Sequence, residues 1–385
     1  MKPLKRVIAA LLILSQVFLT GCWNYREIDT LAIIAGFAID KGEQGHKYHL
    51  TFEMLDFSSG GIKQGSVKPR LLETEGDTIF DAVRNAIKKS EKKFFFSHFK
   101  VVVISQDLAR EGIAPLMDWL TRDSEPRNTA DLVISKEKTA RDILFQKAAT
   151  SPIVSYEIDK ALENDALHLS KAPMGRLYQA IDMLYGNGVS LSLPAIAVSS
   201  SQSGDTPELD GTAVFKKDKL IGYLSGDETK NFLFVENKIK GGLLLVSKET
   251  KDKNITLEIL DSHTEVTPQI TGGKLSMHIS IQTKTALGDV ESPRDYETEE
   301  GIKALETAAG RELAAGIGAL ISKVQRQYDS DIFGFGKAVY QDDPQRWSEI
   351  KSKWDEMFQT LPVTVSVQIK IQNTATAKSS VKAGD

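Results

Sequence analysis

The chain of 385 residues contains a single cysteine, Cys22. One cysteine can form neither an internal disulfide nor a thiolate metal cluster, so the fold must rest on apolar cores and hydrogen bonds. The residues before it narrow its role. Three basic residues, Lys2, Lys5 and Arg6, precede an apolar segment over 7–19. That segment is shorter than the about 20 residues of a membrane-spanning helix, and with its basic start it is typical of a signal peptide.

The signal peptide ends in Leu19-Thr20-Gly21-Cys22, which resembles a bacterial lipobox. In a lipobox an apolar residue and two small residues precede a cysteine that becomes the mature N-terminus. We therefore expect residues 1–21 to be removed and Cys22 to carry N-palmitoyl and S-diacylglyceryl groups. Two or more acyl chains anchor a protein stably to a membrane. The alternative is a free, buried cysteine.

The charge of the chain limits its partners. Removal of residues 1–21 takes the net charge from −4 to −7. An acidic chain argues against nucleic acid and against broad electrostatic adhesion to anionic lipid, so the acyl chains are expected to hold the protein on the membrane. The hydrophobic content of 41% and the charged content of 26% are ordinary for a globular protein. The length predicts two or three domains.

Residues 22–198 predict an N-terminal α/β region with room for two subdomains. The run Leu31–Ile39 is continuously apolar, as in a strand covered on both faces, and residues 48–54 alternate as in a second strand. Residues 58–70 predict a flexible loop, and residues 78–93 have apolar side chains at helical spacing. Further strands are predicted at 99–104 and 131–135, and further helices at 107–120, 139–148, 153–168 and 173–185. An apolar segment at 191–198 closes this half.

Residues 199–210 are rich in Ser, Gly, Asp and Pro and predict a linker. After it, residues 211–373 predict a C-terminal α+β domain with a mostly antiparallel sheet. Residues 374–385 predict a disordered tail. The fold class is therefore α+β or mixed α/β, multidomain, with helices packed on sheets. The predicted strands of this half are 211–216, 219–224, 242–247, 254–260, 275–284 and 363–371.

Two helical segments stand out in the C-terminal half. Residues 298–328 carry one apolar stripe, and Arg311, Glu312 and Lys323 make a membrane span a poor alternative for this helix. A second helix is predicted to start with Asp343 as its N-cap and Pro344 in its first turn. Its aromatic residues share one face, which favours packing in the core over an exposed interface. These residues are Trp347, Trp354 and Phe358.

The sequence carries no convincing catalytic, cofactor or metal signature. The segment GFGKA at 334–338 lacks the spacing and the hydroxyl residue of a phosphate loop, so it predicts a structural turn between two helices. His46 and His49 are three residues apart, but no third ligand is placed nearby, and we expect both to be solvated. We therefore predict that the protein is not an enzyme and needs no cofactor.

Three segments resemble the Ger(x)C family, the lipoprotein C subunits of nutrient germinant receptors in spore-forming bacteria. The first is GCWNYREID, in which Cys22 is followed by Trp23, Asn24 and an Arg-Glu-Ile stretch. The second is DGTAVFKKDKLIGYLSGDET at 210–229, and the third is YDSDIFGFGKAVYQDDPQRWSEIKSKWDEMF at 328–358. The resemblance spans nearly the whole mature chain.

The resemblance implies a non-enzymatic subunit needed for spore germination in response to amino acids or sugars. Its partners would be an A subunit that spans the membrane and a permease-like B subunit, and nutrient recognition is expected on the B subunit. The lipid anchor would hold the protein on the outer face of the spore inner membrane. The family fold is mixed α/β in three domains. The alternative from another class is a lipid-anchored solute-binding protein of a transporter, which should show two repeated parallel α/β lobes.

Overall fold

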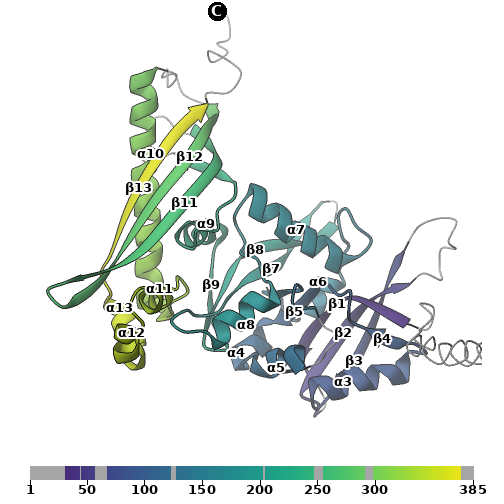
Figure 1. The fold of residues 1–385 in the computed structure, drawn as a ribbon. Coiled ribbons are helices and arrows are strands. Elements are labelled where there is room, and N and C mark those ends of the chain that lie inside the picture. Colours follow the sequence, from purple (N-terminus) through teal and green to yellow (C-terminus); the bar gives the residue numbers. More distant parts are fainter. Residues whose placement is uncertain are drawn as a thin grey trace, which may run out of the picture.

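The computed structural model describes residues 31–43, 45–56, 67–122, 127–202, 204–246, 255–290 and 298–373. These residues form two β-sheets with helices packed on each (Figure 1). A nine-stranded mixed sheet occupies the N-terminal body, and a four-stranded sheet with a long helix stands beside it. The predicted α+β class is therefore confirmed.

The first sheet has the strand order β3-β2-β1-β5-β6-β7-β8-β9, and the short β4 pairs with the start of β1. The four neighbouring strands at its centre run parallel, and the outer pairs are antiparallel. The strands are β1 (Leu31–Lys41), β2 (Tyr48–Asp56), β3 (Lys68–Gly76), β4 (Lys93–Phe95), β5 (Val101–Ser105), β6 (Asp131–Ser135), β7 (Ser192–Ser201), β8 (Gly204–Lys216) and β9 (Lys219–Leu224).

Helices cover both faces of this sheet, as the continuous apolar run of β1 predicts. Along β1, Phe37 and Ile39 point into one core and Ala38 points into the other. Gly112, at a φ of 132°, separates two helices where the sequence predicts one over 107–120. The first face carries α3 (Ile79–Ala86), α4 (Gln106–Glu111), α5 (Ala114–Arg122) and α8 (Leu177–Tyr185), and the second carries α6 (Arg141–Leu144) and α7 (Val154–His168).

The second sheet has the order β10-β11-β12-β13. The first two pairings are antiparallel, and β13 (Val363–Asn373) lies parallel to β12. The hairpin of β11 (Ile255–Thr271) and β12 (Lys274–Val290) extends past the helix at its tip (Figure 1). The remaining strand is β10 (Leu243–Val246).

The long helix α10 (Glu299–Lys323) covers one face of the second sheet and continues in a π turn over Val324–Tyr328. Its predicted stripe is the buried face, because Leu305, Leu313 and Ile317 are all in the core. Gly310 brings the helix close to β13, since a methyl group built there would lie 3.1 Å from the carbonyl oxygen of Val367. The same core receives α9 (Gly226–Val235), which the sequence did not predict.

Three short helices complete the C-terminal body: α11 (Phe335–Asp342), α12 (Pro344–Ile350) and α13 (Trp354–Thr360). The predicted start of α12 is confirmed, because the Asp343 side chain accepts a hydrogen bond from the Arg346 N–H and Pro344 is in the first turn. The prediction that the aromatic residues pack in the core is also confirmed: Trp347, Trp354 and Phe358 are at most 6% exposed.

Two predictions about the chain between the sheets are wrong. Within the predicted linker over 199–210, residues 199–201 and 204–210 form the ends of β7 and β8, which pair through Ser199–Thr206 and Ser200–Asp205. A strand ladder is held by backbone hydrogen bonds, so it tolerates this polar composition on an exposed arm. The second wrong prediction places the strands at 211–216 and 219–224 in the sheet of the C-terminal domain, whereas both belong to the first sheet.

The predicted loop over 58–70 is corrected in part, because residues 68–70 open β3. Its earlier residues, like the predicted tail over 374–385, lie outside the described part of the chain. No helix within the described ranges has both the length and the apolar content needed to cross a membrane.

Candidate functional site: the junction between the two sheets

The predicted lipidation site, Cys22, lies outside the described residues, as do Trp23 and Asn24. The described chain opens at Leu31, the first residue of β1. The residues of the other two family-like segments are described, and both segments meet where the two sheets join. The segment 210–229 forms the end of β8, β9 and the start of α9, and the segment 328–358 runs from the π turn into α13.

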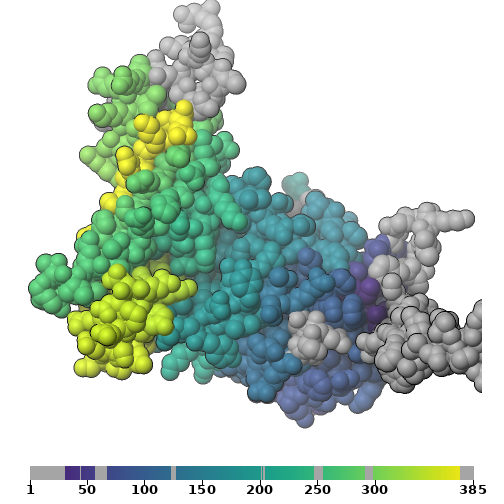
Figure 2. Space-filling view, viewed as in Figure 1, coloured from purple at the N-terminus to yellow at the C-terminus, as the bar shows by residue number. Residues whose placement is uncertain are grey.

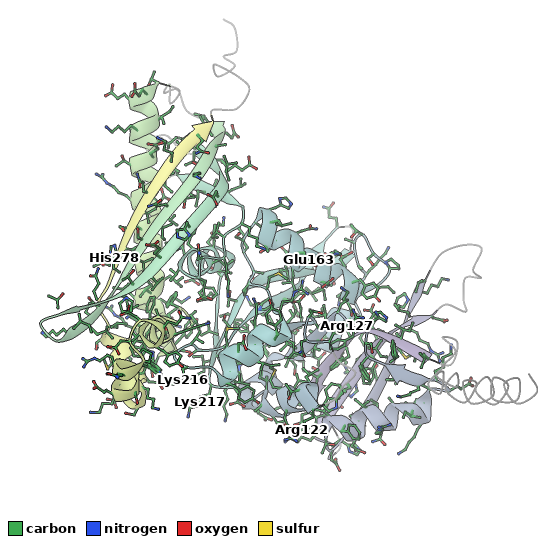
Figure 3. The ribbon with its side chains drawn as sticks, in the orientation of Figure 1. Arg122, Arg127, Glu163, Lys216, Lys217 and His278 are labelled. Atoms are coloured by element: carbon green, nitrogen blue, oxygen red, sulfur yellow. The ribbon has the colours of Figure 1, made fainter. Side chains whose placement is uncertain are left out.

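The junction, as we call it, consists of residues 328–337 and the residues of the N-terminal body that they contact. Its first bonds reach the strands β8 and β9. The Tyr328 hydroxyl donates a hydrogen bond to the carbonyl of Tyr223 at 2.8 Å, and the Ser330 hydroxyl donates to the carbonyl of Phe215 at 2.5 Å. Between them Asp329 forms an ion pair with Lys216, which Figure 3 labels. Three consecutive residues thus tie the C-terminal body to the last strands of the first sheet.

Asp331 is the centre of the junction. It is 5% exposed, and its carboxylate accepts hydrogen bonds from the backbone N–H of Phe335 at 3.1 Å and of Gly336 at 2.8 Å. The indole N–H of Trp354 donates a third bond at 3.0 Å. Burial raises the pKa of Asp331 to about 7, against the lowering effect of these three donors. The carboxylate holds the start of α11 and the start of α13 together.

The other side of the junction is a close contact between two glycines. Gly188 has a φ of 70°, and its carbonyl accepts a hydrogen bond from the Lys337 N–H at 2.8 Å. A methyl group built on Gly336 would lie 2.8 Å from the Gly188 Cα and 2.8 Å from the Trp354 Nε1. The carbonyl of Asp331 accepts a bond from Ser190 N–H at 2.7 Å. Only residues without a side chain fit this contact.

The interpretation of GFGKA as a structural turn between two helices holds only for Gly334, because residues 335–338 form the first turn of α11. Gly334 adopts the left-handed conformation, with a φ of 70°, and opens α11. The N–H groups of Phe335 and Gly336, which a phosphate would need, are already bonded to the Asp331 carboxylate. The start of α11 is therefore occupied by the protein's own anion.

A polar clamp lies next to the junction, between α9 and α10. The Lys323 ammonium contacts both oxygens of Glu228, at 2.7 and 2.9 Å. Glu228 also completes a capping box with Ser225 at the start of α9. The buried hydroxyls of Thr212 and Thr229 share a hydrogen bond of 2.7 Å, which links β8 to α9. Helix α10 and the first sheet therefore hold α9 by polar contacts as well as by the core.

The histidine prediction needs a correction. His46 is exposed, with its Nδ1 3.0 Å from Asp77 Oδ1. His49 is largely buried between two glutamates, with its Nε2 2.9 Å from Glu73 Oε2 and its Nδ1 3.3 Å from Glu75 Oε1. The prediction that His49 is solvated is wrong, because β3, which the sequence did not predict, places acidic residues beside it. Within the described ranges, no group of three or more His, Cys, Asp or Glu residues could hold a metal ion.

A buried ionic cluster lies on the α7 side of the first sheet. Asp131, at the start of β6, is 0% exposed, and its Oδ2 lies 3.1 Å from the Arg176 guanidinium. Arg176 also contacts Asp159 at 3.4 Å and Glu163 at 3.3 Å (Figure 3 labels Glu163). Burial raises the pKa of Asp131 to about 7, since it outweighs the attraction of the single guanidinium. Its oxygens lack an aligned hydrogen-bond donor.

An open hollow of about 830 Å³ lies between α3 and α5. Phe94, Phe96 and Trp119 are among its apolar lining, and Arg84 and Arg122 are among its charged lining. Arg122 is bonded to Asp118 through both carboxylate oxygens at 2.8 Å. The hollow has the size of a small-molecule pocket, but it is open to solvent and its charged groups are at least partly paired with each other.

Sequence reasoning did not single out Asp331, Gly188 or Asp131. Asp331 lies four residues before the first residue of α11 and caps that helix from outside the usual N-cap position, which is directly before the helix. No local signal exists for Gly188, because its partner Gly336 is 148 positions away. The junction joins two bodies through backbone carbonyls, one carboxylate and paired glycines, which defines a rigid structural joint in a two-sheet α+β protein.

Comparison with known proteins identifies the family of the chain. The family model described as "Spore germination protein N-terminal domain" matches residues 24–198, and that described as "Spore germination B3/ GerAC like, C-terminal" matches residues 210–375. Together they cover most of the chain. The protein therefore belongs to the Ger(x)C family of spore germination proteins, and the resemblance seen in its motifs is confirmed.

Individual relatives are similar over nearly their full length. "Spore germination protein KC" of Bacillus subtilis (strain 168) is 26% identical over an alignment of 400 positions, gaps included, which covers 98% of each chain. "Spore germination protein B3" of the same strain is 26% identical over 368 residues, 93% of this chain and 95% of the relative. The crystal structure of the GerBC protein matches with a TM-score of 0.57 at 24% identity, covering 88% of this chain and 97% of that chain. This structural match supports the fold.

Proposed function

We propose that the protein is the lipid-anchored, non-enzymatic C subunit of a nutrient germinant receptor. In this role Cys22 carries the acyl chains, and the protein stands on the outer face of the spore inner membrane beside integral A and B subunits. The observation that carries the proposal is the match of both halves of the chain to spore germination family models. The junction supports it, because a rigid joint suits a subunit that transmits or holds the position of its partners.

The solute-binding alternative has weaker support. Such a protein should show two repeated parallel lobes, but the two sheets here differ in size and in strand direction. The observation in its favour is the hollow between α3 and α5. Titration of the mature chain with amino acids and sugars in a calorimeter is expected to give no heat of binding. Micromolar binding accompanied by domain closure would instead favour a solute-binding protein.

The assignment to a receptor complex has its own experiment. The native lipoprotein, extracted in mild detergent from spore membranes, is expected to co-purify with two integral membrane proteins. The control is an unrelated spore lipoprotein of similar abundance, carrying the same affinity tag. Recovery of the protein without membrane partners, under conditions that preserve other membrane complexes, would contradict the proposal.

Replacement of Cys22 by alanine tests the anchor. The variant is expected to accumulate as unprocessed precursor and to lose all labelling by fatty acid, because no other cysteine exists in the chain. Gel mobility and metabolic labelling measure both effects. Cys22→Ser is the conservative control and should fail in the same way, since a hydroxyl does not form the thioether. Normal cleavage and labelling in either variant would refute lipidation at this residue.

A further inference from the structure

Cationic side chains gather at the end of the N-terminal body where the described chain begins. In the register of β1 with β4, Leu31 pairs with Lys93. Four carboxylates lie near these cations: Asp56 and Glu91 line a hollow with some of them, and Glu73 and Glu75 lie beside Lys88 and Lys89. The exposed cations outnumber these carboxylates, so this end is positive although the whole chain has a net charge of −4. We call this surface the basic face, and its exposed cations are Lys68, Arg70, Lys88, Lys89, Lys92 and Lys93.

Three cations of the basic face come from separate segments and line one hollow. Arg70 from β3 and Lys89 and Lys92 from the turn before β4 line an opening of about 250 Å³ together with Leu31. The Lys89 ammonium donates to the backbone carbonyl of Glu73 at 2.8 Å, which fixes this turn against β3. The Glu73 carboxylate is engaged by His49 and Arg141. The fold therefore assembles the cluster, which only partly follows from the run of lysines over 88–93.

Apolar side chains are exposed on the helix that leads to these cations. On α3 and the 3₁₀ turn Ile87–Lys89, Phe80 is 49% exposed and Ile87 is 42% exposed. The Arg84 guanidinium lies 4.8 Å from the centre of the Phe80 ring. The positions 80, 84, 87 and 88 follow the spacing of one helix face. Exposed apolar and basic side chains on one face are typical of a helix that lies at a membrane interface.

The basic face is also where the chain arrives from its anchor. Only eight residues lie between Cys22 and Leu31, and the nine Cα–Cα steps correspond to at most about 30 Å of extended chain. The earliest described residues, dark purple in Figure 2, lie at the end of the N-terminal body that is remote from the second sheet. An acylated Cys22 would therefore keep this end of the body within reach of the headgroups.

We propose that the basic face docks on anionic lipid headgroups and orients the N-terminal body on the membrane. This inference rests on the proposed function, since the anchor at Cys22 brings the face to the bilayer. The cations would attract the phosphate groups of the lipid, and Phe80 and Ile87 would enter the interface. The net charge argues against broad electrostatic adhesion to anionic lipid, and the proposed attraction is therefore confined to this one surface.

The inference can be tested without acyl chains. The mature chain from position 22, with Cys22→Ser, is mixed with vesicles of pure phosphatidylcholine or with vesicles containing about one-third phosphatidylglycerol. Sedimentation measures the bound fraction. We expect binding to the anionic vesicles only, and loss of that binding at about 1 M salt, where charges are screened within about 3 Å.

Matched variants show which lysines bind the anionic vesicles. The triple variant K88Q/K89Q/K92Q is expected to bind anionic vesicles at least about tenfold more weakly, because each lysine near an anionic surface contributes roughly fivefold. The control K351Q/K353Q/K370Q removes the same charge from exposed lysines of the C-terminal body and should bind as the parent does. Circular dichroism verifies that both variants are folded. Equal weakening in the two variants would overturn the proposal.

A footprint on the unsubstituted chain remains informative if the triple variant does not fold. Acetylation by a water-soluble reagent, read by mass spectrometry, should be slowed at Lys88, Lys89 and Lys92 by anionic vesicles and unchanged at Lys351 and Lys353. No preference for anionic vesicles, or no protection of the basic face, would refute lipid docking and assign the face to an acidic protein surface. A failure of acylation at Cys22 would show separately, in the precursor that accumulates in cells.

Discussion

Replacement of Asp331 by alanine is expected to lower the free energy of unfolding by about 3–5 kcal/mol. The substitution leaves three buried donors without an acceptor: the N–H groups of Phe335 and Gly336 and the indole N–H of Trp354. Each buried, unsatisfied donor costs about 1–3 kcal/mol. The loss of the side-chain volume adds a small cavity. Urea unfolding followed by tryptophan fluorescence measures the difference.

The matched control is Asp355→Ala, at an aspartate 66% exposed that lies 3.8 Å from Lys216. This exposed ion pair contributes little to stability, so the free energy of unfolding of the variant should stay within about 0.5 kcal/mol of that of the parent. A similar loss in both variants would show that the junction carboxylate has no special role.

Hydrogen exchange distinguishes a weakened junction from a general loss of stability. In Asp331→Ala the amides of Lys337 and Ser190, which bond across the junction, are expected to exchange faster than amides in the centre of β5. The reason is that Asp331 fixes the start of α11, and α11 fixes the loop of Gly188. A uniform increase in exchange across both bodies would instead indicate global destabilisation.

The sequence predicts those elements whose residues carry their own signal. The buried strand β1 is visible because Leu31–Ile39 is apolar on both faces, and α10 is visible because its stripe repeats over seven turns. The start of α12 is visible because Asp343 and Pro344 are adjacent in the chain. The three family-like segments are similarly local. Each of these features can be read in one window of residues.

The elements that the sequence did not predict depend on distant partners. The strand β3 has Pro69, Arg70 and two glutamates, and only its pairing with β2 makes it a strand. The hairpin arm over 199–210 is polar because it is exposed, and its partner strands decide its conformation. The basic face combines β3 with the turn before β4, so its net charge is hidden in an acidic composition.

Buried carboxylates form a further class that composition does not reveal. Glu53 accepts hydrogen bonds from the N–H groups of Val154 and Ser155 at the start of α7, and Asp40 accepts from Ala140 and Arg141 at the start of α6. Both acceptors lie in strands about 100 residues before their helices. Burial raises the pKa of Asp40 and of Glu53 above their ordinary values. The protein thus uses strand carboxylates as helix caps, at an electrostatic cost.

That cost predicts an unusual dependence of stability on pH. The folded pKa values of Asp131 and Asp331 are about 7, and their unfolded value is 3.8, so the folded state binds more protons between these limits. The free energy of unfolding therefore falls as pH rises through this window, by on the order of a few kcal/mol, and is constant above it. Carboxylates with lowered pKa values, among them Glu157 and Glu228, act oppositely but only below their unfolded value of 4.5.

Between pH 5 and pH 8 the carboxylates with raised pKa values thus determine how stability changes with pH, and the protein is expected to be most stable near pH 5. The variant Asp131→Asn should flatten the trend and equal or exceed the parent at pH 8, because it removes a buried charge. In this variant the Arg176 guanidinium still donates a hydrogen bond to the carbonyl of Thr129 at 2.8 Å and still contacts the carboxylates of Asp159 and Glu163. The exposed control Asp355→Asn should leave the slope unchanged. Urea midpoints at four pH values measure it, and stability that rises from pH 5 to pH 8 would show that Asp131 and Asp331 remain ionised throughout.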